Sequence, residues 1–123
     1  DGKIQHKYIG WSDWISCGTN ACGITLKYRY NDGLKLCEIN WDGLVNAPIG
    51  GNTMGYMWTG FPADKKPKGN MFIPIANSAA DAGLVIRYYP STNDMTKGNF
   101  TLTSLKNTIN NVYICGFYTY SYA

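Results

Sequence analysis

Aromatic side chains stand beside carboxylate, carboxamide and guanidinium groups at several points in this sequence. A saccharide presents a flat apolar face ringed by hydroxyl groups, so its binding sites combine a Trp or Tyr ring with Asp, Asn or Arg side chains that fix its orientation. This mixture predicts ligand contacts, and we rank Trp58 and Arg87 first among them. The predicted binding residues are Trp58, Arg87, Tyr56, Asp64, Tyr89, Asn93 and Asp94.

These aromatic segments also have a structural interpretation. Trp41-Asp42-Gly43 offers the same mixture, but the strand register described below assigns Trp41 to the core. For Trp58, the core and surface interpretations have about equal weight. Arg87 lies in the middle of an apolar strand, where an arginine either faces outward or is paired.

The sequence shows no catalytic constellation. His6 is the only histidine and lies in the polar N-terminal stretch, where a frayed terminus is the favoured interpretation. The carboxylates include a possible glycosidase pair in principle, but Glu38 is explained by pairing with Lys27. Asp residues in turn-like segments stabilise the backbone locally. We therefore predict no enzyme activity, no catalytic residue and no cofactor.

Four cysteines leave two interpretations open. A structural zinc site usually needs two close pairs of ligands, and only Cys17 and Cys22 are close in sequence, so we predict no metal site. Cys37 and Cys115 lie within strand patterns among apolar residues, which favours reduced thiols in the core. Whether Cys17 and Cys22 close a small loop as a disulfide stays open.

Composition narrows the class of protein. The 123 residues are 45% hydrophobic and 15% charged, which suits one globular domain. The formal net charge of +3 is scattered, and the basic run Lys65-Lys66-Pro67-Lys68 is typical of a solvated loop, so we predict no nucleic-acid partner. No apolar run approaches the ~20 residues that cross a membrane. The chain starts at Asp1 without a leader pattern, which suggests a segment of a longer protein.

The clearest local structure is a hairpin. Residues 24–30 alternate apolar and polar side chains, and Asp32-Gly33 is a strong signal for a two-residue turn. That turn predicts that Ile24, Leu26 and Tyr28 face Trp41, Ile39 and Cys37. On the polar face, Lys27 meets Glu38 and Thr25 meets Asn40. One face is then apolar, and the other carries an opposite-charge pair.

Further short strands are predicted from turn residues and apolar alternation. They span residues 56–61, 71–75, 84–89, 99–103 and 112–122. Pro74 has no N–H to donate, so its strand is at an edge or bulged. Helical signals are limited to single turns at residues 78–82 and 105–109. The pattern predicts an all-β fold, an antiparallel sandwich or a barrel-like domain.

The order of these motifs is similar to that of a known family. A tryptophan-bearing opening is followed by the hairpin, a glycine-rich loop, a Gly-Phe-Pro loop, a Pro-Ile-Ala segment, a Gly-Leu-Val-Ile-Arg segment and an aromatic last strand. They are residues 10–15, 24–43, 49–51, 60–62, 72–77, 83–87 and 112–122. This order resembles the C-terminal head domains of bacteriophage tail-fibre, baseplate and receptor-binding proteins. The resemblance covers about residues 10–123.

The resemblance implies a role and partners. Residues 1–10 would be the end of a stem or linker, and residues 11–123 a head domain. The head would be a homotrimer that attaches to a host cell-surface saccharide. Its other partners would be the remaining tail or baseplate proteins of the virion, and it would be made in the cytoplasm of the bacterial host. An assembly module that binds no glycan is the alternative, and a glycan-cleaving enzyme is less favoured.

Surplus apolar surface supports association between copies. The chain holds 10 Tyr, 4 Trp and 4 Phe, and its last strand pattern is aromatic on both faces. One small sandwich core does not easily hide all of these side chains, and burial between copies is a simple outlet. The residues concerned are Tyr113, Phe117, Tyr118, Tyr120 and Tyr122.

Overall fold

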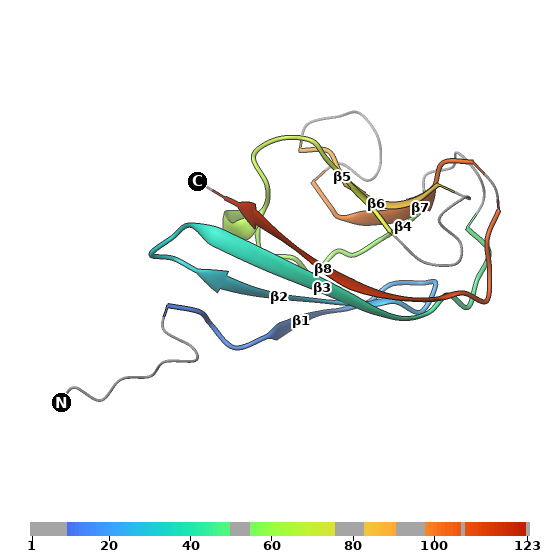
Figure 1. Ribbon diagram of the computed structural model, residues 1–123, viewed down its shortest axis with the longest axis horizontal. Coiled ribbons are helices and arrows are strands. Elements are labelled where there is room, and N and C mark those ends of the chain that lie inside the picture. Colours follow the sequence, from blue (N-terminus) through green and yellow to red (C-terminus); the bar gives the residue numbers. More distant parts are fainter. Residues whose placement is uncertain (1–9, 50–54, 76–82, 91–97, 107, 123) are drawn as a thin grey trace.

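The computed structural model describes residues 10–49, 55–75, 83–90, 98–106 and 108–122. Two antiparallel four-stranded sheets lie face to face, as the sequence predicts (Figure 1). The first sheet has the order β1-β2-β3-β8, with strands Ile15–Thr19, Thr25–Asn31, Leu36–Leu44 and Tyr113–Ser121. The second has the order β4-β7-β6-β5, with strands Tyr56–Met57, Thr101–Ser104, Leu84–Tyr88 and Met71–Pro74.

The core fills the space between the sheets. Side chains alternate along a strand, so one face of each sheet supplies the core while the other faces outward. Ile24, Leu26 and Ile39 enter from the first sheet, and Ile86 and Leu102 enter from the second, all fully buried. The rings of Tyr28, Phe61, Phe100, Tyr88 and Tyr120 form a chain of contacts with centroids 5.0–6.1 Å apart.

The hairpin register differs from the prediction by two residues. Leu26 faces Trp41 and Tyr28 faces Ile39, because the strands are joined by the four residues Asp32–Lys35 and not by Asp32-Gly33 alone. The side-chain oxygen of Asn31 accepts a hydrogen bond from the Leu34 N–H at 3.0 Å, which closes this longer loop.

The polar partners of the hairpin change with the register. Glu38 faces Arg29, and Lys27 faces Asn40, so the predicted Lys27–Glu38 pair is wrong. A shift of two residues keeps every side chain on its predicted face, because the side-chain period of a strand is two. Trp41 is accordingly in the core, as predicted, with 3% of its surface exposed.

The cysteine predictions have a mixed outcome. All four thiols are free, so Cys17 and Cys22 do not form a disulfide in this structure. Cys37 is buried, as predicted, but Cys115 is exposed. The reason is the register between β3 and β8: Cys115 faces Asp42, an outward residue, whereas Cys37 faces the inward Tyr120.

Predictions for the other strands hold with different bounds. β5 is an edge strand, as Pro74 predicts. The strand expected at residues 56–61 is reduced to Tyr56–Met57, although the Trp58 N–H still donates to the Phe100 carbonyl at 2.9 Å. The described residues of 105–109 form no helical turn, and residues 78–82 lie outside the described part. One 3₁₀ turn, η1, spans Ala63–Lys65.

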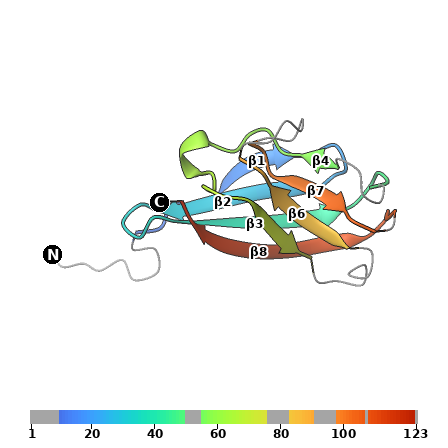
Figure 2. The same ribbon diagram turned by 90° about the horizontal axis from the view of Figure 1, so that it is seen from above.

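The aromatic last strand is divided between core and surface. Tyr120 and Tyr122 are buried, so the prediction that they belong to surplus surface is wrong. Tyr113, Phe117 and Tyr118 are 57%, 68% and 42% exposed. β8 forms an edge of the first sheet. β5, an edge of the second sheet, lies in the other layer, and its end overlaps β8 when the sheets are viewed from above (Figure 2).

Candidate functional site: the outer face of the first sheet

The structure places Trp58 in the core. Only 2% of its surface is exposed, and its indole Nε1–H donates to the Ile24 carbonyl at 2.8 Å. This hydrogen bond runs from the segment after β4 to the residue that precedes β2, so it joins the two layers. A ring held in this way has no face to offer a saccharide, and the surface interpretation of Trp58 is wrong.

Of the other predicted residues, those that the structure describes do not form one site. The Arg87 guanidinium lies 5.0 Å from the ring centroid of Tyr89, so these two come together on the second sheet. The Tyr56 hydroxyl donates to the Pro48 carbonyl at 3.0 Å, and Asp64 lies in η1. Asn93 and Asp94 lie outside the described residues.

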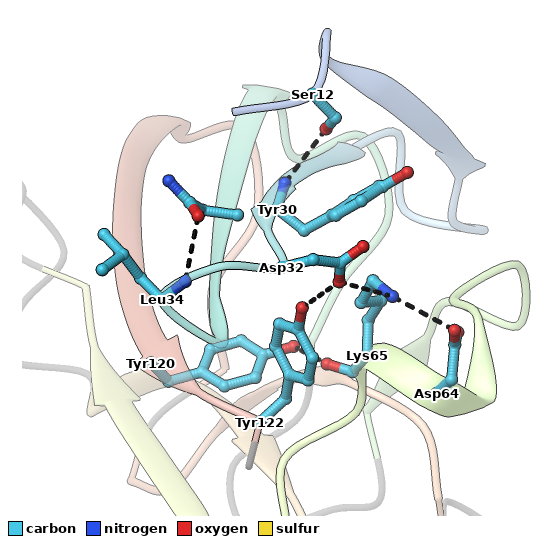
Figure 3. Close-up of polar contacts among 9 residues, drawn as sticks. Ser12, Tyr30, Asp32, Leu34, Asp64, Lys65, Tyr120 and Tyr122 are labelled. Carbon is cyan, nitrogen blue, oxygen red and sulfur yellow. Dashed lines mark hydrogen bonds and ion pairs between the residues drawn. The ribbon is translucent and has the colours of Figure 1, made fainter. Parts of the chain in front are cut away.

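Asp64 belongs to an ionic cluster around Lys65 (Figure 3). The Lys65 ammonium lies 3.1 Å from an Asp64 carboxylate oxygen and 3.4 Å from an oxygen of Asp32. It also lies 4.5 Å from the ring centroid of Tyr30 and 5.0 Å from that of Tyr122, which are cation–π distances. The cluster connects η1 to the hairpin loop and to the end of the chain.

The electrostatics of this cluster favour a structural role. Burial lowers the pKa of Lys65, but the contacts with Asp64 and Asp32 outweigh it, so its pKa lies above the usual value. The hydrogen bond from Tyr122 is the largest cause that lowers the pKa of Asp32. Lys65 therefore stays protonated at neutral pH and acts as a cation between carboxylates, not as a nucleophile.

A polar hollow of about 380 Å³ lies on the outer face of the first sheet. The observed register builds it, because Thr25 faces Asp42 and Lys27 faces Asn40 across β2 and β3. Cys115 of β8 lines the far side opposite Asp42. Lys27 and Asp42 line the same hollow, yet no ion pair joins them among the described residues. The Lys27 ammonium and the Asp42 carboxylate therefore both line the hollow without forming an ion pair with each other.

Hydrogen bonds and aromatic rings frame this hollow. The Tyr113 hydroxyl donates to Asp42, and this hydrogen bond is the largest cause that raises the pKa of Tyr113. The hydroxyls of Thr19 and Thr25 lie 2.7 Å apart. Phe117 faces Asn40 across the β3–β8 ladder and is 68% exposed. The hollow thus has hydroxyl, amide, carboxylate and ammonium groups beside exposed rings.

The same outer face continues toward the hairpin loop. The guanidinium of Arg29 lies 4.8 Å from the ring centroids of both Trp11 and Trp14. Its Nε donates to Glu38 at 2.7 Å, and Glu38 also accepts from the Thr119 hydroxyl at 3.2 Å. Trp14 remains 42% exposed, so a second aromatic surface lies on this face at its other end.

The sequence carries part of the signal for this hollow. Alternation predicts that Thr25, Lys27 and Asn40 lie on the polar face of the hairpin, and Asp42 continues the same alternation. The missing information was that β8 lies next to β3, because only that pairing brings Tyr113, Cys115 and Phe117 beside them.

The described residues contain no group of three or more His, Cys, Asp or Glu side chains placed to hold a metal ion. Within the same part of the chain, no helix is long and apolar enough to cross a membrane. A comparison with protein-family models found none that matches this chain, and a comparison with curated protein sequences found no match.

Proposed function

We propose that this chain is the receptor-binding head of a bacteriophage or prophage tail, and that it attaches to a host cell-surface saccharide through the outer face of the first sheet. The observation that carries this proposal is the polar hollow between Lys27 and Asp42, flanked by exposed Tyr113 and Phe117. Such a site orients hydroxyl groups with its polar side chains and covers an apolar sugar face with a ring.

Binding is better supported than cleavage. Hydrolysis of a glycosidic bond uses two carboxyl groups, roughly 5–9.5 Å apart, on either side of the bond. Among the described residues that line the hollow, Asp42 is the only carboxylate. The hollow also holds Lys27 and Asn40, which orient a polar ligand but do not complete such a pair.

The resemblance supports the remaining parts of the proposal. The head is proposed to be a homotrimer that joins other tail or baseplate proteins of the virion, after synthesis in the bacterial cytoplasm. Light scattering at micromolar concentration counts the copies: a mass of three chains is expected, or of six if the further contact proposed below is also made, and a monomer contradicts the homotrimer.

Adsorption to a panel of intact bacteria and purified wall polysaccharides tests the proposed function. We expect at least one member of the panel to bind the wild-type chain. Asp42→Ala should weaken that binding at least about 10-fold, since a hydrogen bond to a charged group contributes about 1.5–3 kcal/mol. The matched control is Asp64→Ala, which removes a carboxylate from η1 and should leave binding unchanged. Equal losses in both variants, or no binding by the wild type, contradict the proposal.

A second candidate is an assembly module without glycan binding, favoured by the exposed aromatic residues of β8. It predicts that Asp42→Ala leaves adsorption of the assembled particle unchanged, whereas truncation after Val112 prevents assembly.

A further inference from the structure

The four outer edges of the two sheets differ in how well they are protected. β1 has only five residues and an irregular register between Ser16 and Thr19. β4 has two residues, and β5 ends in Pro74. Short strands, bulges and proline are the usual means by which proteins prevent pairing at a sheet edge. Three of the four edges are therefore blocked.

β8 has none of these protections. It pairs with β3 through all nine of its residues without a register shift, and no described strand lies on its other side. Its sequence, Tyr113–Ser121, contains no charged residue and no proline. Phe117 on the outer face is 68% exposed, and Tyr118 on the inner side is 42% exposed. A long, uncharged edge with exposed rings is suited to pairing with another strand.

An apolar groove lies beside this edge, between β8 and the end of β5. It has a volume of about 440 Å³ and is lined by Trp41, Ile73, Pro74, Cys115, Gly116, Phe117 and Tyr118. Gly116 has no room for a side chain, because a Cβ would lie 2.7 Å from the Trp41 ring. The Trp41 Nε1–H is buried and has no acceptor among the described residues, although buried donors are usually paired. Within the described part of the chain, the groove therefore lacks both a covering side chain and an acceptor.

We propose that β8 pairs with β8 of a second copy of this chain, in antiparallel orientation about a two-fold axis. When a strand pairs with its own copy in this way, one residue must lie opposite itself. Use of all nine residues places Phe117 at that centre. The two first sheets then join into one continuous eight-stranded sheet.

This register complements the groove. With Phe117 opposite itself, Gly116 lies opposite Tyr118 of the second copy. Gly116 already faces Trp41 of β3 within its own chain, so aromatic rings then stand across from this glycine on both of its neighbouring strands. The Tyr118 ring of each copy then covers the Gly116–Trp41 surface of the other. It also brings a hydroxyl oxygen, which is an acceptor, to the groove that contains the Trp41 indole.

The protected state of the other three edges explains why the strand that pairs with β8 is β8 of a second copy. Pairing of β8 with a different strand of the second copy would need another open edge, and β1, β4 and β5 are blocked. Pairing of identical strands satisfies both copies at once and closes the assembly. The contact predicts two copies, or six if the proposed three-fold contact is also made.

Cysteine cross-linking tests the register. In a chain with Cys115→Ser, the further change Phe117→Cys should give a disulfide-linked dimer on oxidation with diamide, because the two introduced thiols face each other across the two-fold axis. Thr119→Cys in the same background is the matched control. Its two thiols would lie about 13 Å apart along the strands and should not link. Cross-linking of the Thr119→Cys chain alone, equal cross-linking of both variants, or none overturns the proposed pairing.

Light scattering tests the contact without a cross-link. The wild-type chain should have the mass of two or six copies at micromolar concentration. Tyr118→Lys should halve that mass, because it places two ammonium groups in an apolar contact. Phe72→Lys makes a similar change at an exposed aromatic of β5 and should leave the mass unchanged. A wild-type monomer or trimer, or the same effect from both variants, overturns the proposal. This outcome does not depend on saccharide binding.

Discussion

Trp58 combines full burial with a hydrogen bond that crosses from one sheet layer to the other. Trp58→Phe removes the donor and leaves the Ile24 carbonyl with only its hydrogen bond from the Asn20 N–H. It also leaves part of the indole volume empty. We expect a loss of about 2–4 kcal/mol in the free energy of unfolding, measured by urea denaturation.

Trp14 provides the control for that measurement. It is 42% exposed, and its ring makes a cation–π interaction with Arg29. Trp14→Phe should therefore cost only about 0.5–1 kcal/mol. If the two variants lose equal stability, Trp58 does not have the buried role assigned to it.

The four thiols should differ in reactivity because the thiolate is the reactive form. Burial raises the pKa of Cys17 to about 12, and those of Cys22 and Cys37 to about 11. Cys115 is exposed on the outer face. At pH 8, iodoacetamide should label Cys115 first in the native chain, and mass spectrometry of peptides identifies the site. Faster labelling of Cys22 or Cys37 contradicts the structure.

At the scale of elements, η1 is held to the hairpin loop and to the chain end by the cluster of Lys65, Asp32 and Tyr122. Burial and the hydrogen bond to Asp32 raise the pKa of Tyr122 from 10.0 to about 12. The folded chain therefore holds this proton more tightly than the unfolded chain. The stabilisation is fully present below pH 10 and is lost as the pH rises toward 12.

Tyr122→Phe should remove this part of the pH dependence. Between about pH 9 and pH 11.5, the wild-type chain should lose more stability than the variant, as measured by the urea midpoint at each pH. The Asp32 carboxylate, whose pKa is lowered, contributes at the opposite end and loses its effect as the pH falls below about 4. Identical alkaline losses in wild type and variant would show that Tyr122 does not stabilise this connection.

The strands of this fold were predictable from local pattern, but their pairing was not. Alternation correctly identified the faces of β2 and β3, because a face depends only on the parity of the register. The register itself depended on Asn31 bonding to the Leu34 N–H, which lengthened the loop beyond the Asp-Gly pair. Pro74 predicted an edge strand correctly, because a residue without a backbone N–H cannot donate to a neighbouring strand in any fold.

At the scale of the whole molecule, the site depends on which strands become neighbours. A sequence can mark aromatic and polar residues as suitable for a saccharide. It does not show that Trp58 is buried while Tyr113 and Phe117 are exposed beside the hollow. Tertiary contacts decide which of these residues are exposed. Pairing with the segment that leads into β7 places Trp58 between the layers. Pairing of β8 with β3 brings Tyr113 and Phe117 beside Asn40 and Asp42. Those contacts join residues about 40–80 positions apart, which local pattern does not specify.

The central claim, that the outer face of the first sheet binds a saccharide, is tested most directly by nuclear magnetic resonance of the ¹⁵N-labelled chain. A wall polysaccharide that adsorbs the wild-type chain is titrated into the sample. The amide signals of Thr25, Lys27, Asn40, Asp42 and Cys115 should shift together, while those of Arg87 and Tyr89 on the second sheet should stay in place. Shifts confined to the second sheet, or no shifts at saturation, would contradict the claim.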